Sequence, residues 1–292
     1  MSREVNVLVD IRAQVGEGAL WDEKAQVFYW VDILSNALYV YDPVTEQNRS
    51  YDVGQHVGTV VLRESGGVML ALANGFASYD LESGQLTLIS DPESHLPGSR
   101  FNDGKCDPGG RFWAGTMAYE NQSTQGSLYR VDADLSVHKM LGDIGISNGI
   151  VWTGDKQTMY YIDSMAYSVR AFDYDNATGD ISNERVVVSV PRAMSVPDGM
   201  AIDADGMLWV AHFGAARVRC WNPHTGQLMD EIVLPAKQIT SCAFGGEKLD
   251  TLFITSAATG LDAAALAEQP LAGSLFAVKP GVTGVPTYRF AG

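Results

Sequence analysis

The segment GSLYRVDADLS, at residues 126–136, alternates apolar and polar residues and then reaches a turn rich in Asp. Five further segments repeat this strand-then-turn pattern: NALYVYDPVTEQ at 36–47, GFASYDLESGQ at 75–85, YSVRAFDYDNATG at 167–179, ARVRCWNPHTGQ at 216–227 and GSLFAVKPGVTG at 273–284. A period of two that ends at Asp, Asn, Pro or Gly predicts a strand followed by a hairpin turn. The six copies lie about 38 to 57 residues apart, which is in the range of propeller blades.

Between these copies lie short, nearly continuous apolar runs, such as QVFYWVDI, RFWAGTM, TMYYIDS and MLWVAHFG. Such runs are typical of strands that are buried on both faces. Six four-stranded units cannot each bury both faces alone, but they can when they pack radially around an axis. The sequence therefore predicts an all-β fold, a six-bladed β-propeller of four-stranded blades, as one domain over residues 1–292. A β-sandwich or two β domains is the alternative, and six regular periods argue against it.

The two ends of the chain are expected to close this ring. The N-terminal strand near VNVLVDIR would complete the last blade alongside the C-terminal PTYRFAG, which removes the exposed edges of an open repeat array. The one stretch that suggests a short helix is LDAAALAEQ, at 261–269.

Composition narrows the class of partner. The formal net charge is −15 and the pI is near 4.6, which disfavours binding to nucleic acid or anionic membranes. No apolar run approaches a membrane span, and the first residues do not have the pattern of a signal peptide. The three cysteines, Cys106, Cys220 and Cys242, are scattered and odd in number, which predicts free thiols in a reducing cytoplasm. We expect a cytoplasmic monomer or small homo-oligomer that acts on a small molecule.

Four oxygen-bearing residues recur at one register of the repeat. Glu17, Asn102, Asn148 and Asp198 each lie eleven to thirteen residues before an aromatic at the centre of a repeated strand. Equivalent positions in a cyclic repeat converge on its axis. Two carboxylates and two carboxamides that converge there predict a cation site.

The donor set indicates the kind of cation. Hard ions such as Ca²⁺, Mg²⁺ and Mn²⁺ prefer oxygen ligands, and Zn²⁺ also accepts carboxylates. The structural alternative is that Asn and Asp before a strand satisfy a local turn, but Glu17 is not a favoured turn residue. The matching positions in the other two blades, near Gly58 and Thr240–Ser241, are small and would leave room for a substrate.

Other polar residues are given structural roles. Asp32 and Asp163 end equivalent strands, so we expect them to hold turns between blades. Asp103 follows Asn102 and could support it from a second layer, and a lone His212 at a strand end is more often structural. The sequence contains no nucleophile elbow, phosphate-binding glycine loop or HExxH motif.

At these residues the chain resembles the senescence-marker-protein, gluconolactonase and regucalcin family over nearly its whole length. The matching segments are GEG at 16–18, SRFNDGKCDPGGRFWAGTM at 99–117, GSLYRVD at 126–132, ISNGIVW at 146–152 and PDGMAIDADGMLWVA at 197–211. The family usually has GEGP, and Ala19 replaces that proline here.

The resemblance implies a propeller that binds one divalent metal, Ca or Zn first and otherwise Mn, Mg or Fe, and that hydrolyses sugar lactones. It implies two groups of site residues, metal ligands and substrate contacts: Glu17, Asn148 and Asp198, and Arg100, Asn102 and Glu120. The metal would act as a Lewis acid on the lactone carbonyl. Asp198 is similar to the residue that serves as general base in this family, and activation of water by the metal is the alternative.

Three other functions remain open at this point. Related propellers hydrolyse organophosphate triesters with a calcium site in the same place. A non-catalytic binding or calcium-handling propeller is the second, although propellers that serve as scaffolds do not need carboxylates at the axis. A quinone-dependent oxidoreductase would need more cationic and histidine groups near the axis. For a lactonase, we expect specificity to lie in the loops at 54–58, 119–125 and 212–216.

Overall fold

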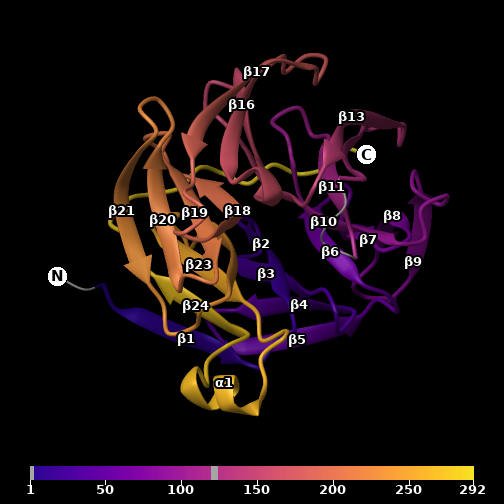
Figure 1. Ribbon diagram of the computed structural model, residues 1–292. Helices are drawn as coiled ribbons and strands as arrows, with labels where there is room; N and C mark the ends of the chain where they lie inside the picture. Colours follow the sequence, from indigo (N-terminus) through magenta and orange to yellow (C-terminus); the bar gives the residue numbers. More distant parts are fainter. Residues whose placement is uncertain (1–2, 120–123) are drawn as a thin grey trace.

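The computed structural model describes residues 3–119 and 124–292. Its strands form six four-stranded antiparallel sheets arranged in a ring, as Figure 1 shows. The predicted all-β, six-bladed propeller is therefore confirmed.

We number the blades along the chain from the one that follows the first strand. Blade 1 contains β2 (Gly16–Asp22), β3 (Val27–Asp32), β4 (Ala37–Asp42) and β5 (Gln47–Asp52). Blade 2 contains β6 (Val57–Leu62), β7 (Val68–Leu72), β8 (Gly75–Tyr79) and β9 (Leu86–Ser90). Blade 3 contains β10 (Ser99–Cys106), β11 (Phe112–Ala118), β12 (Gly126–Val131) and β13 (Val137–Ile144). Blade 4 contains β14 (Ser147–Trp152), β15 (Thr158–Asp163), β16 (Ser168–Tyr174) and β17 (Ile181–Ser189).

The last two blades complete the ring. Blade 5 contains β18 (Val196–Ile202), β19 (Leu208–Phe213), β20 (Arg217–Asn222) and β21 (Gln227–Val233). Blade 6 contains β22 (Ile239–Gly245), β23 (Thr251–Ser256), β24 (Ser274–Val278) and the N-terminal β1 (Val5–Asp10). In blades 1 to 5 the inner strand is the first of the blade in chain order, and in blade 6 the inner strand is β22. All six inner strands are almost wholly buried.

Closure by the N-terminal strand is confirmed, but its expected partner is wrong. β1 pairs with β24, from Val5 opposite Val278 to Asp10 opposite Ser274, and not with the segment 286–292. Pro280, which lacks a backbone N–H, and Gly281, at φ +91°, follow β24 and divert the chain from the sheet.

Residues 279–292, which we call the C-terminal strap, instead cross one end of the ring (Figure 1). The strap hydrogen-bonds to the turns that follow the inner strands: Ala204 N donates to Thr283 O, Gly284 N donates to Leu249 O, and Ala291 N donates to Gly110 O. It therefore covers the end of the channel at which the inner strands finish.

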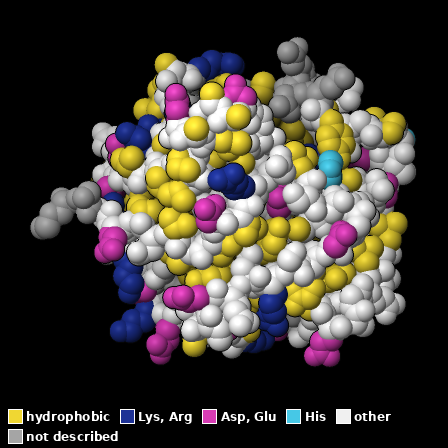
Figure 2. All heavy atoms as spheres, turned by 90° about the horizontal axis from the view of Figure 1, so that it is seen from below, with side chains coloured by type: hydrophobic (Ala, Val, Ile, Leu, Met, Phe, Trp, Pro, Cys, Tyr) yellow, Lys and Arg dark blue, Asp and Glu magenta, His cyan; other side chains and the backbone are white. Residues whose placement is uncertain are grey.

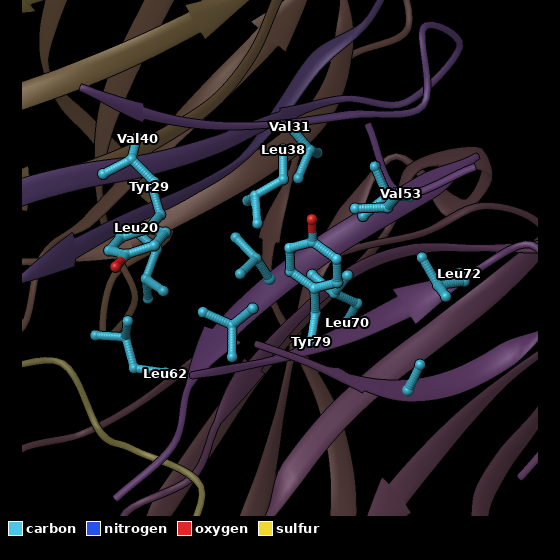
Figure 3. Packing of buried hydrophobic residues seen from close by; sticks show 14 of the residues in the cluster. Leu20, Tyr29, Val31, Leu38, Val40, Val53, Leu62, Leu70, Leu72 and Tyr79 are labelled. Atoms are coloured by element: carbon cyan, nitrogen blue, oxygen red, sulfur yellow. The ribbon is translucent and has the colours of Figure 1, made fainter. Parts of the chain in front are cut away.

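The hydrophobic core is divided into six clusters, one between each pair of neighbouring blades. Figure 3 shows the cluster between blades 1 and 2, where Leu20 and Val31 face Leu62 and Leu70. Because each blade buries side chains on both faces, the strands lack the one-sided alternation of an open sheet. This packing fixes the inner strands around the axis.

In the described part of the chain, two short helices lie in connections: the 3₁₀ turn η1 (Ser164–Ala166) and α1 (Ala263–Glu268). α1 falls within the segment for which a short helix was suggested. No helix among the described residues is long and apolar enough to cross a membrane. Figure 2 shows acidic side chains scattered singly among apolar and neutral ones on the face that it presents.

Candidate metal and substrate site

The inner strand of every blade is interrupted at the same level. In each, the pairing with the second strand shifts register, and the shifts fall at Glu17/Leu20, Val57/Thr59, Phe101/Gly104, Ser147/Ile150, Pro197/Met200 and Ile239/Cys242. Such β-bulges leave residues unpaired and re-aim their side chains. Asn102, Asn148 and Asp198 lie within these interruptions and Glu17 lies at the edge of one, so the predicted register corresponds to a ring of bulges.

Glycines beside these residues allow the blades to approach closely. A Cβ at Gly149 would lie 2.9 Å from Asp198 O, and one at Gly199 would lie 2.3 Å from Ser241 Oγ. A glycine inside a strand often marks a bulge or a close backbone contact. The sequence patterns Asn-Gly and Asp-Gly at these positions are therefore a signal for the bulges.

The Asn148 side chain has one free end. Its Nδ2 donates to Ser164 Oγ over 3.0 Å, and Ser164 Oγ donates to Pro197 O over 2.7 Å. Asn148 Oδ1 is buried and has no hydrogen-bond partner. A buried acceptor without a partner is costly, so this oxygen is suited to a ligand.

The Asn102 carboxamide, unlike that of Asn148, has hydrogen-bond partners at both ends. Its Oδ1 accepts from an Arg100 guanidinium nitrogen over 2.8 Å, and its Nδ2 donates to Ser147 O over 2.8 Å. The residue pattern alone grouped Asn102 with the cation ligands. The geometry separates it from Asn148 and brings it together with Arg100.

Three carboxyl groups are buried beside Asn148. Burial raises the pKa of Glu17 well above its usual range, and the charges of Asp198 and Asp103 raise it further. Burial also raises the pKa of Asp198 strongly, with a contribution from Asp103, although its contacts with the Asn148 side chain, the Gly199 amide and Glu17 partly offset this. Three acidic side chains therefore lie close together, and the hydrogen bonds within the site do not offset the cost of ionising them.

The buried side chain of Arg100 lies close to these carboxyls. Arg100 is nearly inaccessible, and burial lowers its pKa, while the neighbouring Tyr119, Glu17 and Asp198 side chains oppose that effect. Its guanidinium also donates to Phe101 O over 2.9 Å. The predicted substrate contact Glu120 lies outside the described residues.

The turn-holding roles expected for Asp32 and Asp163 are confirmed. Asp32 accepts hydrogen bonds from the backbone of Gln14 and Val15, and Asp163 accepts from Gly145 and Ile146. Each carboxylate thus holds the connection that enters its own blade.

Two further expectations concern histidine and cysteine. His212 is fully buried between Ser195 and Trp221, so it supports blade 5 and does not line an open pocket. All three cysteines are free and buried.

Comparisons with known proteins agree with this geometry. Residues 15–258 match the family described as SMP-30/Gluconolactonase/LRE-like region. The chain belongs to this family. It is 41% identical over 294 residues to "Regucalcin" of Danio rerio, covering 100% of this chain and 99% of that one. It is 40% identical over 283 residues to "Putative sugar lactone lactonase YvrE" of Bacillus subtilis (strain 168), covering 97% of each.

A solved structure is similarly close. The calcium-binding protein regucalcin from Agrobacterium tumefaciens strain C58 superposes with a TM-score of 0.94 at 27% identity, covering 99% of this chain and 98% of that one. The region matched to the SMP-30/gluconolactonase family contains the six residues named from the sequence as metal ligands and substrate contacts.

The described side chains fit a hard divalent cation. Glu17 and Asp198 supply carboxylate oxygens, and Asn148 supplies an uncharged oxygen with no other partner. Within residues 3–119 and 124–292, no group of three or more His, Cys, Asp and Glu is placed to hold a metal. A bound cation would also offset the repulsion among the carboxylates.

Proposed function

We propose that this chain hydrolyses a sugar lactone to the aldonic acid and uses one divalent metal ion held by Glu17, Asn148 and Asp198. Family membership supports an enzyme of the lactonase class, since the family description includes gluconolactonase and one 40% identical relative is named for sugar lactone hydrolysis. The observation that carries the metal assignment is the unpartnered Asn148 Oδ1 beside two buried carboxyls.

The chemistry divides between the ion and the protein. A divalent cation, when bound, supplies a Lewis acid that polarises an ester carbonyl. Asp198 accepts a proton from the attacking water through a carboxylate oxygen. The water oxygen adds to the carbonyl carbon and gives a tetrahedral intermediate. When the carbonyl re-forms, the bond from that carbon to the ring oxygen breaks, and Asp198 returns the proton to the ring oxygen.

Two opposing effects set the basicity of Asp198. Burial raises its pKa, whereas coordination to a cation would lower it. A carboxylate that uses one oxygen as a ligand keeps the other for the proton. Activation of the water without Asp198 is the competing route, and substitution of Asp198 separates the two.

Arg100, Asn102 and Glu120 are proposed to orient the sugar. The Arg100–Asn102 hydrogen bond fixes a guanidinium and a carboxamide next to the carboxyl cluster. These groups can donate to ring hydroxyls, and the positive charge of Arg100 also favours the negative charge that develops on the substrate.

The metal is proposed to be Ca²⁺ or Zn²⁺, with Mn²⁺, Mg²⁺ and Fe²⁺ as further candidates. The all-oxygen donor set favours a hard ion, and the Agrobacterium relative is described as a calcium-binding protein.

The test is proton release from a panel of aldonolactones, using metal-stripped protein and protein restored with each ion. Spontaneous hydrolysis is subtracted from every trace. We expect acceleration that depends on the ion and is largest for one or two sugars. Folded protein that accelerates no lactone with any ion would contradict the proposal.

Two other activities are tested when a phosphotriester is added to the substrate panel and Ca²⁺ binding is measured on the same protein. Binding of Ca²⁺ without hydrolysis would favour a non-catalytic calcium-binding protein, which the description of the Agrobacterium relative makes a specific alternative. Hydrolysis of a phosphotriester in preference to every lactone would favour the organophosphate hydrolase.

We further infer one domain over residues 1–292, because β1 from one end of the chain completes the blade built by the other end. A cytoplasmic location is supported by three free cysteines. A monomer or small homo-oligomer without nucleic-acid or membrane partners remains the prediction.

A further inference from the structure

Two side chains that have no role in the proposed hydrolysis meet above the site. His56 directly precedes the inner strand β6 of blade 2, and Tyr119 directly follows β11 of blade 3. His56 Nδ1 and the Tyr119 hydroxyl lie 2.7 Å apart, and the ring centroids are 5.7 Å apart. The pair therefore joins two blades at the end of the channel where the inner strands begin.

The contact with Tyr119 shows which way His56 faces. A Cβ at Gly58 would collide with Asn102 O, so blades 2 and 3 approach closely just after His56. His56 spans the two blades at this point, because its Nδ1 reaches the Tyr119 hydroxyl at the end of the channel where the inner strands begin.

Tyr119 is linked to the site through Arg100. The Arg100 guanidinium carbon lies 5.8 Å from the centre of the Tyr119 ring, within the range of a cation–π contact. Arg100 is 9% exposed, whereas Tyr119 is 44% exposed. A buried cation of the site thus holds an aromatic ring that remains open to solvent.

The chemistry of the pair suits a polyhydroxylated ligand. A half-exposed tyrosine ring has an apolar face and a hydroxyl that both donates and accepts. Burial and the nearby Arg100 charge lower the pKa of His56, which favours a neutral ring with one donor and one acceptor nitrogen. The loops that carry both residues, 54–58 and 119–125, are two of the three that the sequence marked for specificity.

We propose that His56 and Tyr119 form a specificity wall that binds the hydroxylated side chain which a hexono-1,4-lactone carries outside its ring. The reacting carbonyl must lie at the level of Asn148 and Asp198, and Arg100 and Asn102 reach the ring. The wall is nearer the entrance, so it meets the substituent that points out of the site. This inference rests on the proposed lactonase function.

The test compares two substrates with the same ring. A hexono-1,4-lactone has the two-carbon side chain, and erythrono-1,4-lactone has the ring hydroxyls without it. We expect Tyr119→Phe and His56→Ala each to lower kcat/KM for the hexonolactone by about 3- to 10-fold, the effect of one neutral hydrogen bond, with a change below about twofold for erythronolactone. The double variant should lose less than the product of the single losses, because the two side chains act as one pair.

Tyr51→Phe is the matched control, because Tyr51 lies on β5, the outer strand of blade 1. It should leave both substrates unaffected. Thermal unfolding of each variant checks the fold, and Tyr119→Phe, which removes one oxygen, serves if His56→Ala is unstable.

The outcomes distinguish this wall from the activity itself. Equal losses on both lactones, or no loss on either, overturn the wall while hydrolysis by the unmodified protein stands. An unmodified protein that hydrolyses neither these nor any other lactone with any ion overturns the proposed function, and the wall falls with it.

Discussion

Asn148 Nδ2 donates a hydrogen bond to Ser164 Oγ over 3.0 Å, and this contact fixes which end of the carboxamide faces the axis. A serine hydroxyl has a single proton, and that of Ser164 is given to Pro197 O, which can only accept. Ser164 must therefore accept from Asn148, so the amide nitrogen points at Ser164. The oxygen is left without a protein partner. The same hydroxyl holds the carbonyl that precedes Asp198, so it aligns two proposed ligands from two blades.

The first prediction is that Ser164→Ala weakens metal binding. Without the hydroxyl, Asn148 Nδ2 loses its acceptor and the carboxamide is no longer held in one orientation. Loss of a group that orients a ligand typically costs 10- to 100-fold in metal affinity, and we expect a loss of about that size. Isothermal titration of the metal-stripped protein with Ca²⁺ or Mn²⁺ measures it directly, without reference to turnover.

Ser256→Ala is the matched control for this experiment. Ser256 is also fully buried, and its hydroxyl donates to Ser274 O over 2.7 Å within blade 6. It should lower stability without altering affinity for the ion. Ser164→Thr, which keeps the hydroxyl, should restore much of the binding. Equal affinities in Ser164→Ala and Ser256→Ala would show that Ser164 does not position the ligands.

The second prediction concerns Asp198→Asn. The carboxamide keeps an oxygen for the ion but cannot take a proton, so we expect partial metal binding with a fall in kcat of at least about 100-fold. Titration and turnover are measured on the same preparation. Near-normal kcat at saturating metal would rule out the base role and favour water activated without Asp198.

The fold was accessible from the sequence because its signals are local and repeated. Each blade carries its own strand and turn pattern, and six copies leave few other ways to bury strands on both faces. The convergence of Glu17, Asn148 and Asp198 followed from the same register. The sequence pattern places PTYRFAG in the last blade because this segment has the composition of a strand. Only the spatial arrangement shows that β24 already has two partners, β1 and β23.

The parts of the site that were not predicted depend on contacts between distant residues. Ser164 precedes Pro197 by 33 positions, and His56 precedes Tyr119 by 63. Neither pair belongs to a motif, and a serine or a tyrosine at such a place is common. The difference between Asn102 and Asn148 is likewise set by which neighbours occupy each amide, not by the residue type or the register.

The third prediction concerns the strap. Phe290 is fully buried in the cluster between blades 2 and 3, and its backbone amide donates to Leu62 O over 2.8 Å. Phe290→Ala should lower the free energy of unfolding by about 3 to 5 kcal/mol, because it leaves a large cavity. KM for the lactone should not change, since the strap lies at the end of the channel away from the site. Urea unfolding and steady-state kinetics measure the two effects.

The control for the strap is Val44→Ala, because Val44 is 85% exposed and makes little packed contact. We expect its unfolding midpoint to match that of the unmodified protein. A Phe290→Ala variant with unaltered stability would mean that the strap does not stabilise the ring. A raised KM in this variant would mean that the strap affects the substrate site.

The last prediction is a pH dependence that originates at His212. Trp221 Nε1 can only donate, and it donates to His212 Nε2 over 3.3 Å. The other nitrogen, Nδ1, therefore carries the proton and donates to Ser195 Oγ over 2.5 Å. Burial, helped by the charge of Arg219, lowers the pKa of His212 to about 3.

This shift has a definite sign. Histidine in an unfolded chain has a pKa of about 6.5, so below that pH the unfolded chain binds a proton that the folded protein does not bind. Stability is therefore full above about pH 6.5 and is lost as the pH falls toward 3, by about 2 kcal/mol between pH 7 and pH 5. His212→Gln keeps a donor and an acceptor without a titrating ring, so its urea midpoint should fall less over this interval. His224→Gln, in an exposed turn, should retain the full pH dependence. The opposing result is a urea midpoint that changes equally with pH in the unmodified protein, His212→Gln and His224→Gln. That result would show that His212 titrates in the folded state as it does in the unfolded chain and does not contribute to acid sensitivity.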